Sequence, residues 1–166
     1  QNMIKKFNYL FVTMFGLGKI KIIPGTFGSL ATIIILYILF HILNISSNFI
    51  LLGLIVISIY SFSAIASYIE KNDNKDPKEI VIDELIGQSI PICLYEVAHK
   101  KSTEINEILI TYSIIFILFR IFDITKPYPV SYYDKNFKNS FGVVMDDVCA
   151  GLYVVAVLVL YMVFSS

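Results

Sequence analysis

Hydrophobic residues form long, nearly uncharged runs that are separated by short polar segments. The runs cover residues 30–43, 49–69, 80–98, 108–125 and 143–164. A helix needs about 20 apolar residues to cross the hydrocarbon core of a bilayer, and the run at 49–69 has that length without a charge. No run shows the alternation of a strand. We therefore predict an all-α integral membrane bundle with about four to five membrane helices.

One of these runs leaves its topology open. The segment 80–98 carries an acidic pair near its start and Pro91 in its middle. Its pattern fits either a full span or a half-inserted helix, and the sequence does not decide between them.

Composition supports the membrane prediction. The chain is 57% hydrophobic and 16% charged, with a mean hydropathy of +0.74. Soluble domains average about 25% charged residues. The formal net charge is zero, so a nucleic-acid partner is not expected. The length suits a single membrane-embedded domain over residues 1–166. Nothing in the pattern indicates an oligomeric state.

The N-terminal segment resembles a signal peptide, because residues 3–18 have a basic start and an apolar body. No A-x-A-like cleavage site follows, and Met3 is the expected natural start. We predict instead an interfacial amphipathic segment over residues 1–28, followed by the bundle at 29–166. Four lysines are expected to anchor this segment at the bilayer surface: Lys5, Lys6, Lys19 and Lys21.

Tracing five spans assigns each polar connection to one of two sides of the membrane. Eleven of the thirteen Lys and Arg residues fall on the side where the run at 30–43 begins. They are Lys5, Lys6, Lys19, Lys21, Lys71, Lys75, Lys78, Arg120, Lys126, Lys135 and Lys138. Only Lys100 and Lys101 fall on the other side. The positive-inside rule predicts that the lysine-rich side is cytoplasmic.

The same trace brings four polar motifs to the cytoplasmic end of the helices. These motifs are the segment IIPGTFGS (residues 22–29), the pair Asp83 and Glu84, the trio Arg120, Asp123 and Lys126, and the pair Asp146 and Asp147. They are spread over more than a hundred residues of sequence. Their convergence at one depth predicts a functional site.

The motifs contribute five carboxylates, and clustered anions in a low-dielectric site would repel one another unless a cation is bound. Oxygen ligands favour Mg²⁺ or Ca²⁺ over zinc. The alternative is that each acidic pair only begins a helix in contact with solvent, where carboxylates interact favourably with the helix dipole. His41 and His99 fall away from the motifs, so we expect them to be structural or on the surface. Cys93 and Cys149 lie inside apolar runs without metal-ligand spacing, so we expect both to be buried small apolar residues.

Positive charge in the same motifs indicates an anionic substrate. Arg120 offers a bidentate fork for phosphate, and Lys126 a point charge. An internal Arg–Asp pair with Lys126 reaching the headgroups is the alternative. Thr26 and nearby amides could also bind phosphate, and Thr26 or Ser29 could cap the next helix.

Two glycines follow the acids by one helical turn. Gly87 lies one turn after Asp83, and Gly151 one turn after Asp147. Small residues permit close approach between helices, so these positions would bring carboxylates of different helices together.

Four motifs together resemble the phosphatidylglycerophosphatase A family. They are PGTFGS (24–29), IVIDELIG (80–87), FRIFDITKPYPV (119–130) and FGVVMDDVCAG (141–151), in family order and spacing. The resemblance implies an enzyme of the bacterial inner membrane, and the positive-inside rule predicts that the site of this multi-pass protein lies on the cytoplasmic side. It implies Mg²⁺-dependent removal of the terminal phosphate of phosphatidylglycerophosphate, which yields phosphatidylglycerol in phospholipid biosynthesis.

We can then assign expected roles. The catalytic candidates are Asp83, Glu84, Asp123, Asp146 and Asp147. The metal ligands are expected among Asp83, Glu84, Asp123 and Asp147. The phosphate-binding candidates are Thr26, Arg120 and Lys126. An acid that does not bind metal could serve as general base or as nucleophile, and the sequence leaves that choice open.

Other functions remain to be weighed. A cation transporter or channel could use the same carboxylates, although a site at one face rather than at the midplane argues against it. A histidine-dependent lipid phosphatase would need histidines at the motifs, and a CDP-alcohol phosphotransferase would need a D-x-x-D-G run, which is absent. A scaffold for anionic lipids would not explain five clustered acids.

Overall fold

The computed structural model describes residues 2–70, 78–98 and 104–165, and within them it contains helices and no strand. The helices are α1 (Asn2–Val12), α2 (Pro24–Tyr37), α3 (Ser47–Ile69), α4 (Ile82–Ala98), α5 (Ile105–Thr125), α6 (Val130–Asn136) and α7 (Ser140–Ser165). A short 3-10 turn, η1 (Leu17–Lys19), precedes α2, and a π-helical segment, η2 (Ile38–Ile42), continues it. The predicted all-α class is confirmed.

Four helical segments are long and apolar enough to cross a membrane. They are Pro24–Ile42, Ser47–Ile69, Ile105–Thr125 and Ser140–Phe164. Large apolar side chains cover their outer surfaces, as expected where lipid rather than water is the solvent. The chain is therefore a multi-pass membrane protein, at the lower end of the predicted four to five spans.

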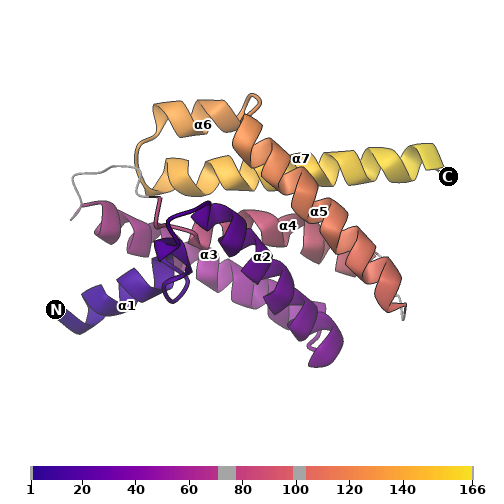
Figure 1. Ribbon diagram of the computed structural model, residues 1–166, viewed down its shortest axis with the longest axis horizontal. Coiled ribbons are helices and arrows are strands. Elements are labelled where there is room, and N and C mark those ends of the chain that lie inside the picture. Colours follow the sequence, from indigo (N-terminus) through magenta and orange to yellow (C-terminus); the bar gives the residue numbers. More distant parts are fainter. Residues whose placement is uncertain (1, 71–77, 99–103, 166) are drawn as a thin grey trace.

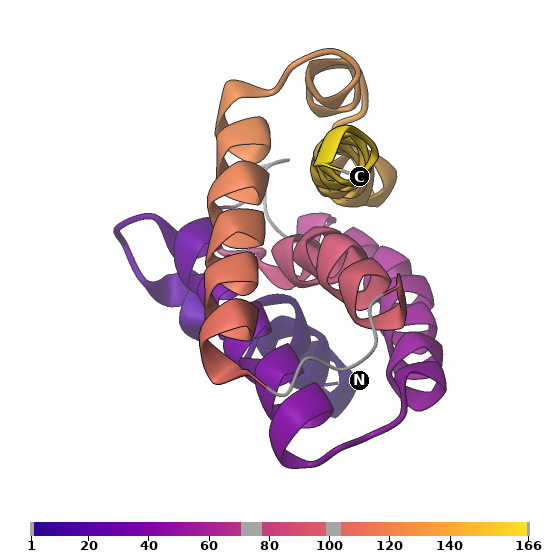
Figure 2. The ribbon, with the colours of Figure 1, turned by 90° about the vertical axis from the view of Figure 1, so that its right-hand side faces the viewer.

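Helix α4 is the central helix of the bundle. It packs against α2, α3, α5 and α7, and Figures 1 and 2 show it between these longer helices. Its 17 residues are fewer than a bilayer core requires, and it is not among the four candidate spans. Because neighbouring helices cover it, α4 can carry buried polar side chains such as Gln88 and Ser89.

The first span extends beyond the apolar run at 30–43. Helix α2 begins at Pro24, within the segment 22–29, because proline fits the first position of a helix, where its missing N–H is not needed. The N-cap is Ile23, in the left-handed region at φ 48°, and no side chain caps the helix. Thr26 and Ser29 therefore lie inside the first turns, and the prediction that either one caps the helix is wrong.

Helix α1 packs on α3 at the end of the bundle where α2 begins. The hydroxyl of Tyr60 donates a hydrogen bond to Asn8 at 2.5 Å, and Phe11 meets the edge of the same tyrosine ring. The other face of α1 exposes Met3 and Ile4. Such a two-faced helix suits a bilayer surface, and the interfacial placement of residues 1–28 stays a prediction.

Polar side chains also meet at the opposite end of α4. Glu96 accepts a hydrogen bond from the Tyr112 hydroxyl at 2.7 Å, and His41 Nε2 lies 2.9 Å from the same carboxylate oxygen. This cluster joins η2, α4 and α5, so the structural role expected for His41 agrees with its contacts.

The expectations for the two cysteines can be compared with the structure, whereas those for some lysines and for His99 cannot. Both cysteines are buried and unpaired, as expected for small apolar residues. Several residues of the sequence argument lie outside the described part of the chain: Lys71, Lys75, His99, Lys100 and Lys101.

Candidate functional site

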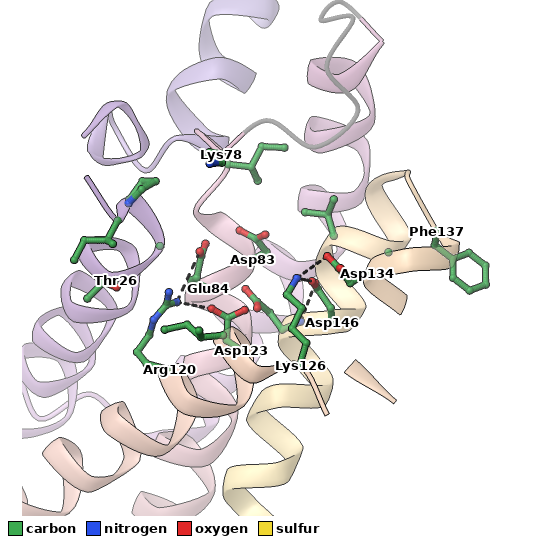
Figure 3. A pocket seen from close by; sticks show the side chains of 18 of the residues that line it. Thr26, Lys78, Asp83, Glu84, Arg120, Asp123, Lys126, Asp134, Phe137 and Asp146 are labelled. Atoms are coloured by element: carbon green, nitrogen blue, oxygen red, sulfur yellow. Dashed lines mark hydrogen bonds and ion pairs between the residues drawn. The ribbon is translucent and has the colours of Figure 1, made fainter. Parts of the chain in front are cut away.

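A pocket of about 750 Å³ lies where the first turns of α2, α4 and α7 meet the last turn of α5, with α6 on one flank (Figure 3). All eight residues that the sequence singled out line it: Thr26, Asp83, Glu84, Arg120, Asp123, Lys126, Asp146 and Asp147. The convergence that follows from alternating helix directions is therefore present in the fold.

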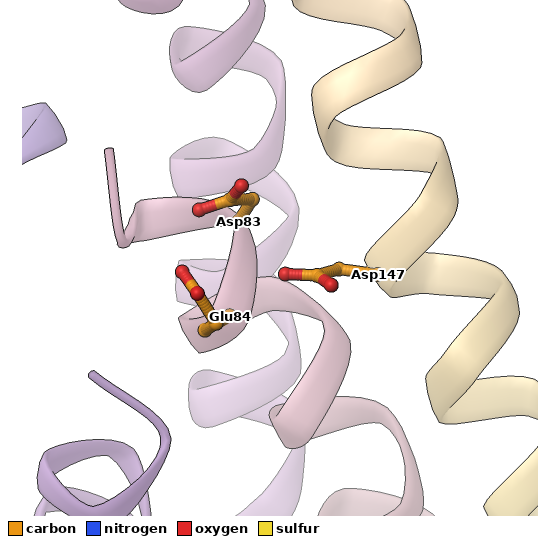
Figure 4. Close-up of side chains that lie close together, drawn as sticks. All are labelled: Asp83, Glu84 and Asp147. Carbon is orange, nitrogen blue, oxygen red and sulfur yellow. The ribbon is translucent and has the colours of Figure 1, made fainter. Parts of the chain in front are cut away.

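Three of the carboxylates form a compact group. Asp83 and Glu84 come from the first turn of α4, and Asp147 comes from the second turn of α7 (Figure 4). One oxygen from each lies within 4.8 Å of the others. A single cation could contact all three, since carboxylate oxygens are the ligands that Mg²⁺ and Ca²⁺ prefer.

Close contact between α4 and α7 brings these carboxylates together. A Cβ on Gly87 would lie 2.5 Å from the carbonyl oxygen of Asp147, and a Cβ on Gly151 would collide with the carbonyl oxygen of Gly87. Both distances are too short for any side chain. The two glycines thus allow the backbones to touch, as their spacing from the acids suggested.

Helix α2 also approaches the carboxylates closely. A Cβ on Gly25 would collide with Glu84 and would lie 3.2 Å from Nη1 of Arg120. Gly25 therefore leaves room for both side chains. Thr26 lines the pocket beside it, which is the position expected of a residue that meets the substrate.

Arg120 contacts residues of its own helix, of α2 and of α4. Its Nη1 lies 2.7 Å from Oδ2 of Asp123 and 4.0 Å from Oε1 of Glu84, and it donates to the Ser29 hydroxyl at 3.4 Å. Asp123 was expected to be a metal ligand. In the structure its carboxylate contacts Arg120, and among the described residues the compact group contains only the other three acids.

Lys126 lies just beyond the end of α5, in the left-handed region at φ 45°. The helix ends before Pro127, as the sequence indicates, so Lys126 leaves the helical line of Arg120 and Asp123. Its Nζ donates to Asp134 at 2.6 Å and to Asp146 at 2.9 Å. Burial alone would lower the pKa of Lys126, but Asp146 and Asp134 raise it above its usual value, so the side chain stays charged.

Asp134 was not among the site residues expected from the sequence. It lies after Pro129, in a segment without an apolar run, and this segment forms α6 against α7. The available signal was an acid within reach of Lys126, eight residues downstream and on the same side of the membrane. Because the segment between α5 and α7 has no apolar periodicity, its sequence did not indicate that it packs beside the pocket.

Electrostatics make the three-carboxylate group unfavourable without a cation. Burial and the neighbouring Glu84 raise the pKa of Asp83 well above its usual value. Burial raises the pKa of Glu84 to about 7, although a hydrogen bond from Asp83 and the charge of Arg120 act in the opposite direction. Both groups lie outside the four membrane-spanning segments.

Two buried carboxylate oxygens in this group have no hydrogen-bond partner from the described residues. They are Oδ1 of Asp83 and Oε2 of Glu84. Buried carboxylate oxygens ordinarily have a partner. A divalent cation would supply one, so the donor set, its spacing and these two orphaned oxygens all fit a hard metal ion.

Comparison with known proteins identifies relatives along most of the chain. Residues 10–162 match the family model described as phosphatidylglycerophosphatase A. A phosphatidylglycerophosphatase A of Haemophilus influenzae is 35% identical over 150 residues, which are 90% of this chain and 85% of the relative. The Escherichia coli protein of that name is 31% identical over 145 residues, covering 87% and 77%.

A third relative carries a different name. A Bacteroides thetaiotaomicron protein, provisionally named as a phosphatidylinositol-3-phosphatase, is 36% identical over 144 residues, which are 85% of this chain and 84% of the relative. No solved structure matches the chain significantly.

Proposed function

The chain belongs to the phosphatidylglycerophosphatase A family, a family of phosphatases, and from that premise we propose that it is a Mg²⁺-dependent lipid phosphatase. Its substrate is phosphatidylglycerophosphate, and its products are phosphatidylglycerol and inorganic phosphate. We place it in the bacterial inner membrane, with its site on the cytoplasmic side.

The observation that carries this proposal is the pairing of charges in the pocket. Asp83, Glu84 and Asp147 form a group of a size suited to one cation, and two cationic side chains, Arg120 and Lys126, lie at its edge. A metal site alone would not need those cations. A phosphate that bridges the metal and the two side chains would need all of them.

The protein's own residues have distinct tasks in this proposal. Asp83, Glu84 and Asp147 hold the metal, and Arg120 and Lys126 bind the phosphoryl oxygens. Bound Mg²⁺ supplies further charge neutralisation of the phosphoryl group. Asp123 and Asp146 keep Arg120 and Lys126 in place through contacts of 2.7 and 2.9 Å. These two carboxylates are also the candidates for general base or nucleophile.

The position of the pocket suits a lipid substrate. It opens at the end of the bundle where α1 lies, so a headgroup could enter while its acyl chains stay beside the spans. The cytoplasmic placement rests on the excess of Lys and Arg at this end. A cation transporter is less favoured, because the carboxylates come from the first turn of α4 and the second turn of α7 rather than from the midplane.

The name of the Bacteroides relative supports a second candidate substrate, phosphatidylinositol 3-phosphate. Both candidate lipids carry a phosphomonoester beyond a phosphodiester, so the same pocket could meet the same chemical group in either one.

The test is release of inorganic phosphate by the purified protein in neutral detergent micelles. Phosphatidylglycerophosphate, phosphatidylinositol 3-phosphate and phosphatidic acid are compared, each with Mg²⁺ and with excess chelator. We expect the fastest Mg²⁺-dependent release from phosphatidylglycerophosphate. Preference for the inositol lipid would favour the second candidate. Absence of release from every lipid, while the protein remains folded, would overturn the phosphatase proposal.

A further inference from the structure

Three lysines at the pocket have no role in the proposed function. Lys21 precedes α2, Lys78 precedes α4, and Lys138 lies between α6 and α7, yet all three line the same pocket. All three are exposed. Figure 3 shows Lys78 on the far side of Asp83 and Glu84 from Arg120 and Lys126. Three separate connections thus each bring a cation to the mouth of one pocket.

The ion pairs found in the pocket do not involve these three lysines. Arg120 pairs with Asp123 and, at 4.0 Å, with Glu84, and Lys126 pairs with Asp134 and Asp146. Among the residues that line the pocket, the other acids belong to the metal group, and the remaining cations are Lys21, Lys78 and Lys138. No ion pair within the described ranges involves these lysines. The inner cations are therefore shared with carboxylates, while the outer ones are available to a ligand.

The substrate of the proposed function carries more charge than the inner site is built to hold. Phosphatidylglycerophosphate has a terminal phosphomonoester and, one glycerol unit away, a phosphodiester. A phosphomonoester holds between about one and a half and two negative charges near neutral pH, and in the proposed function it meets the metal and two side chains, Arg120 and Lys126, that are already shared with carboxylates. The diester is a second anion at a fixed separation. A cavity of about 750 Å³ is large for one phosphate and can hold both.

We propose that Lys21, Lys78 and Lys138 form a second anion subsite, which binds the phosphodiester of the substrate and thereby selects lipids whose phosphomonoester lies beyond a second phosphate. This inference rests on the proposed function and deepens it. Lysine suits such a task because its ammonium is a compact point charge that tolerates several orientations of a diester. Phosphatidic acid, whose single phosphate is attached directly to diacylglycerol, cannot fill both subsites.

The test compares kcat and KM for phosphatidylglycerophosphate and phosphatidic acid in neutral micelles. The variant replaces the three lysines together (Lys21→Gln, Lys78→Gln and Lys138→Gln). The control is Lys135→Gln, because Lys135 is exposed on α6 and does not line the pocket. Losing one exposed ion pair changes an equilibrium constant by up to about fivefold, and the variant removes three lysines. We therefore expect the KM for phosphatidylglycerophosphate to rise on the order of tenfold or more. The kcat of the variant, its KM for phosphatidic acid and both constants of the control should stay unchanged.

Two outcomes would overturn the subsite. An equal rise of KM for both lipids would mean that the lysines attract any anionic lipid, and an unchanged KM would mean that they do not meet the substrate. Direct binding of the soluble headgroup glycerophosphoglycerol, measured by calorimetry, supplies a readout without turnover. If the wild-type protein binds this headgroup and the triple variant does not, while neither hydrolyses any lipid, the subsite would be supported and the phosphatase proposal would be wrong. Equal binding by both proteins would contradict the subsite.

Discussion

The carbonyl oxygen of Gly87 on α4 lies directly against Gly151 on α7, so that a Cβ on Gly151 would overlap it. This backbone contact sets the distance between Asp83 and Glu84 on one helix and Asp147 on the other. Helix contacts through small residues are common in membranes, where close van der Waals packing replaces the hydrophobic effect. Here the contact also shapes the carboxylate group.

Gly87→Ala should therefore weaken metal binding. The added Cβ would lie 2.5 Å from the carbonyl oxygen of Asp147, so α7 must move away from α4. We expect a loss of metal affinity of at least about tenfold and a loss of stability of about 1–3 kcal/mol from overpacking. The measurement is the rise in melting temperature on addition of Mg²⁺ or Mn²⁺.

Gly53→Ala is the matched control for that experiment. Gly53 lies within α3, and nothing lies within 4 Å of the position of its Cβ. This variant should keep the metal-induced shift of the wild-type protein. If Gly87→Ala also keeps it, close approach of the helices does not control the site.

Asp134 should act through Lys126. We expect Asp134→Asn to lower kcat/KM about tenfold, because one of the two carboxylates that hold the ammonium is lost, and Lys126→Met to lower it by more. The double variant should equal Lys126→Met alone, since residues that share one interaction are not additive. Fully additive effects in this cycle would show that Asp134 has a separate task.

The position of the site could be predicted from sequence, whereas its internal contacts could not. Successive long helices, including the shorter α4, alternate in direction, so Asp83, Asp123 and Asp147 had to reach the same end of the bundle. The directions of the helices and the order of the motifs are sufficient to place these residues at one depth. They do not determine which side chains pair with one another.

The contacts that escaped prediction depend on backbone geometry at the ends of helices. The left-handed conformation of Lys126 turns its side chain toward Asp134 on α6, which has no apolar periodicity that would reveal it as a helix. The early start of α2 at Pro24 places Gly25, rather than a loop, against Glu84. The shortness of α4 is tolerated because neighbouring helices enclose it.

Metal affinity should increase with pH. In the metal-free protein burial raises the pKa values of Asp83 and Glu84, that of Glu84 to about 7. A protonated carboxyl cannot bind the cation, so protons compete with the metal below that pH and are released when it binds. Calorimetric titrations at pH 6 and pH 8 should show tighter binding at pH 8, with proton uptake by the buffer. Equal affinity at both pH values would contradict the buried carboxylate site.

The cluster at the other end of α4 should affect stability without affecting catalysis. Glu96→Ala leaves Tyr112 and His41 without their shared partner, and leaving a buried hydrogen-bonding group unsatisfied costs about 1–3 kcal/mol. Glu96→Gln keeps an acceptor and should cost less. Glu96 lies twelve residues from Glu84, roughly 18 Å along the helix, so both variants should keep wild-type kcat at low temperature. A change in metal dependence would show coupling between the two ends.

The central claim is that a cation held by Asp83, Glu84 and Asp147 is required for removal of the terminal phosphate of phosphatidylglycerophosphate. Its most direct test is phosphate release from that lipid by the wild-type protein and by Asp147→Asn, each with Mg²⁺ and with excess chelator. We predict rapid release only by the wild-type protein with Mg²⁺, and at least a hundredfold less in the other three arms, on the order of losing a principal electrostatic contact in catalysis. Full release in chelator, or by Asp147→Asn at the wild-type rate, would contradict the account.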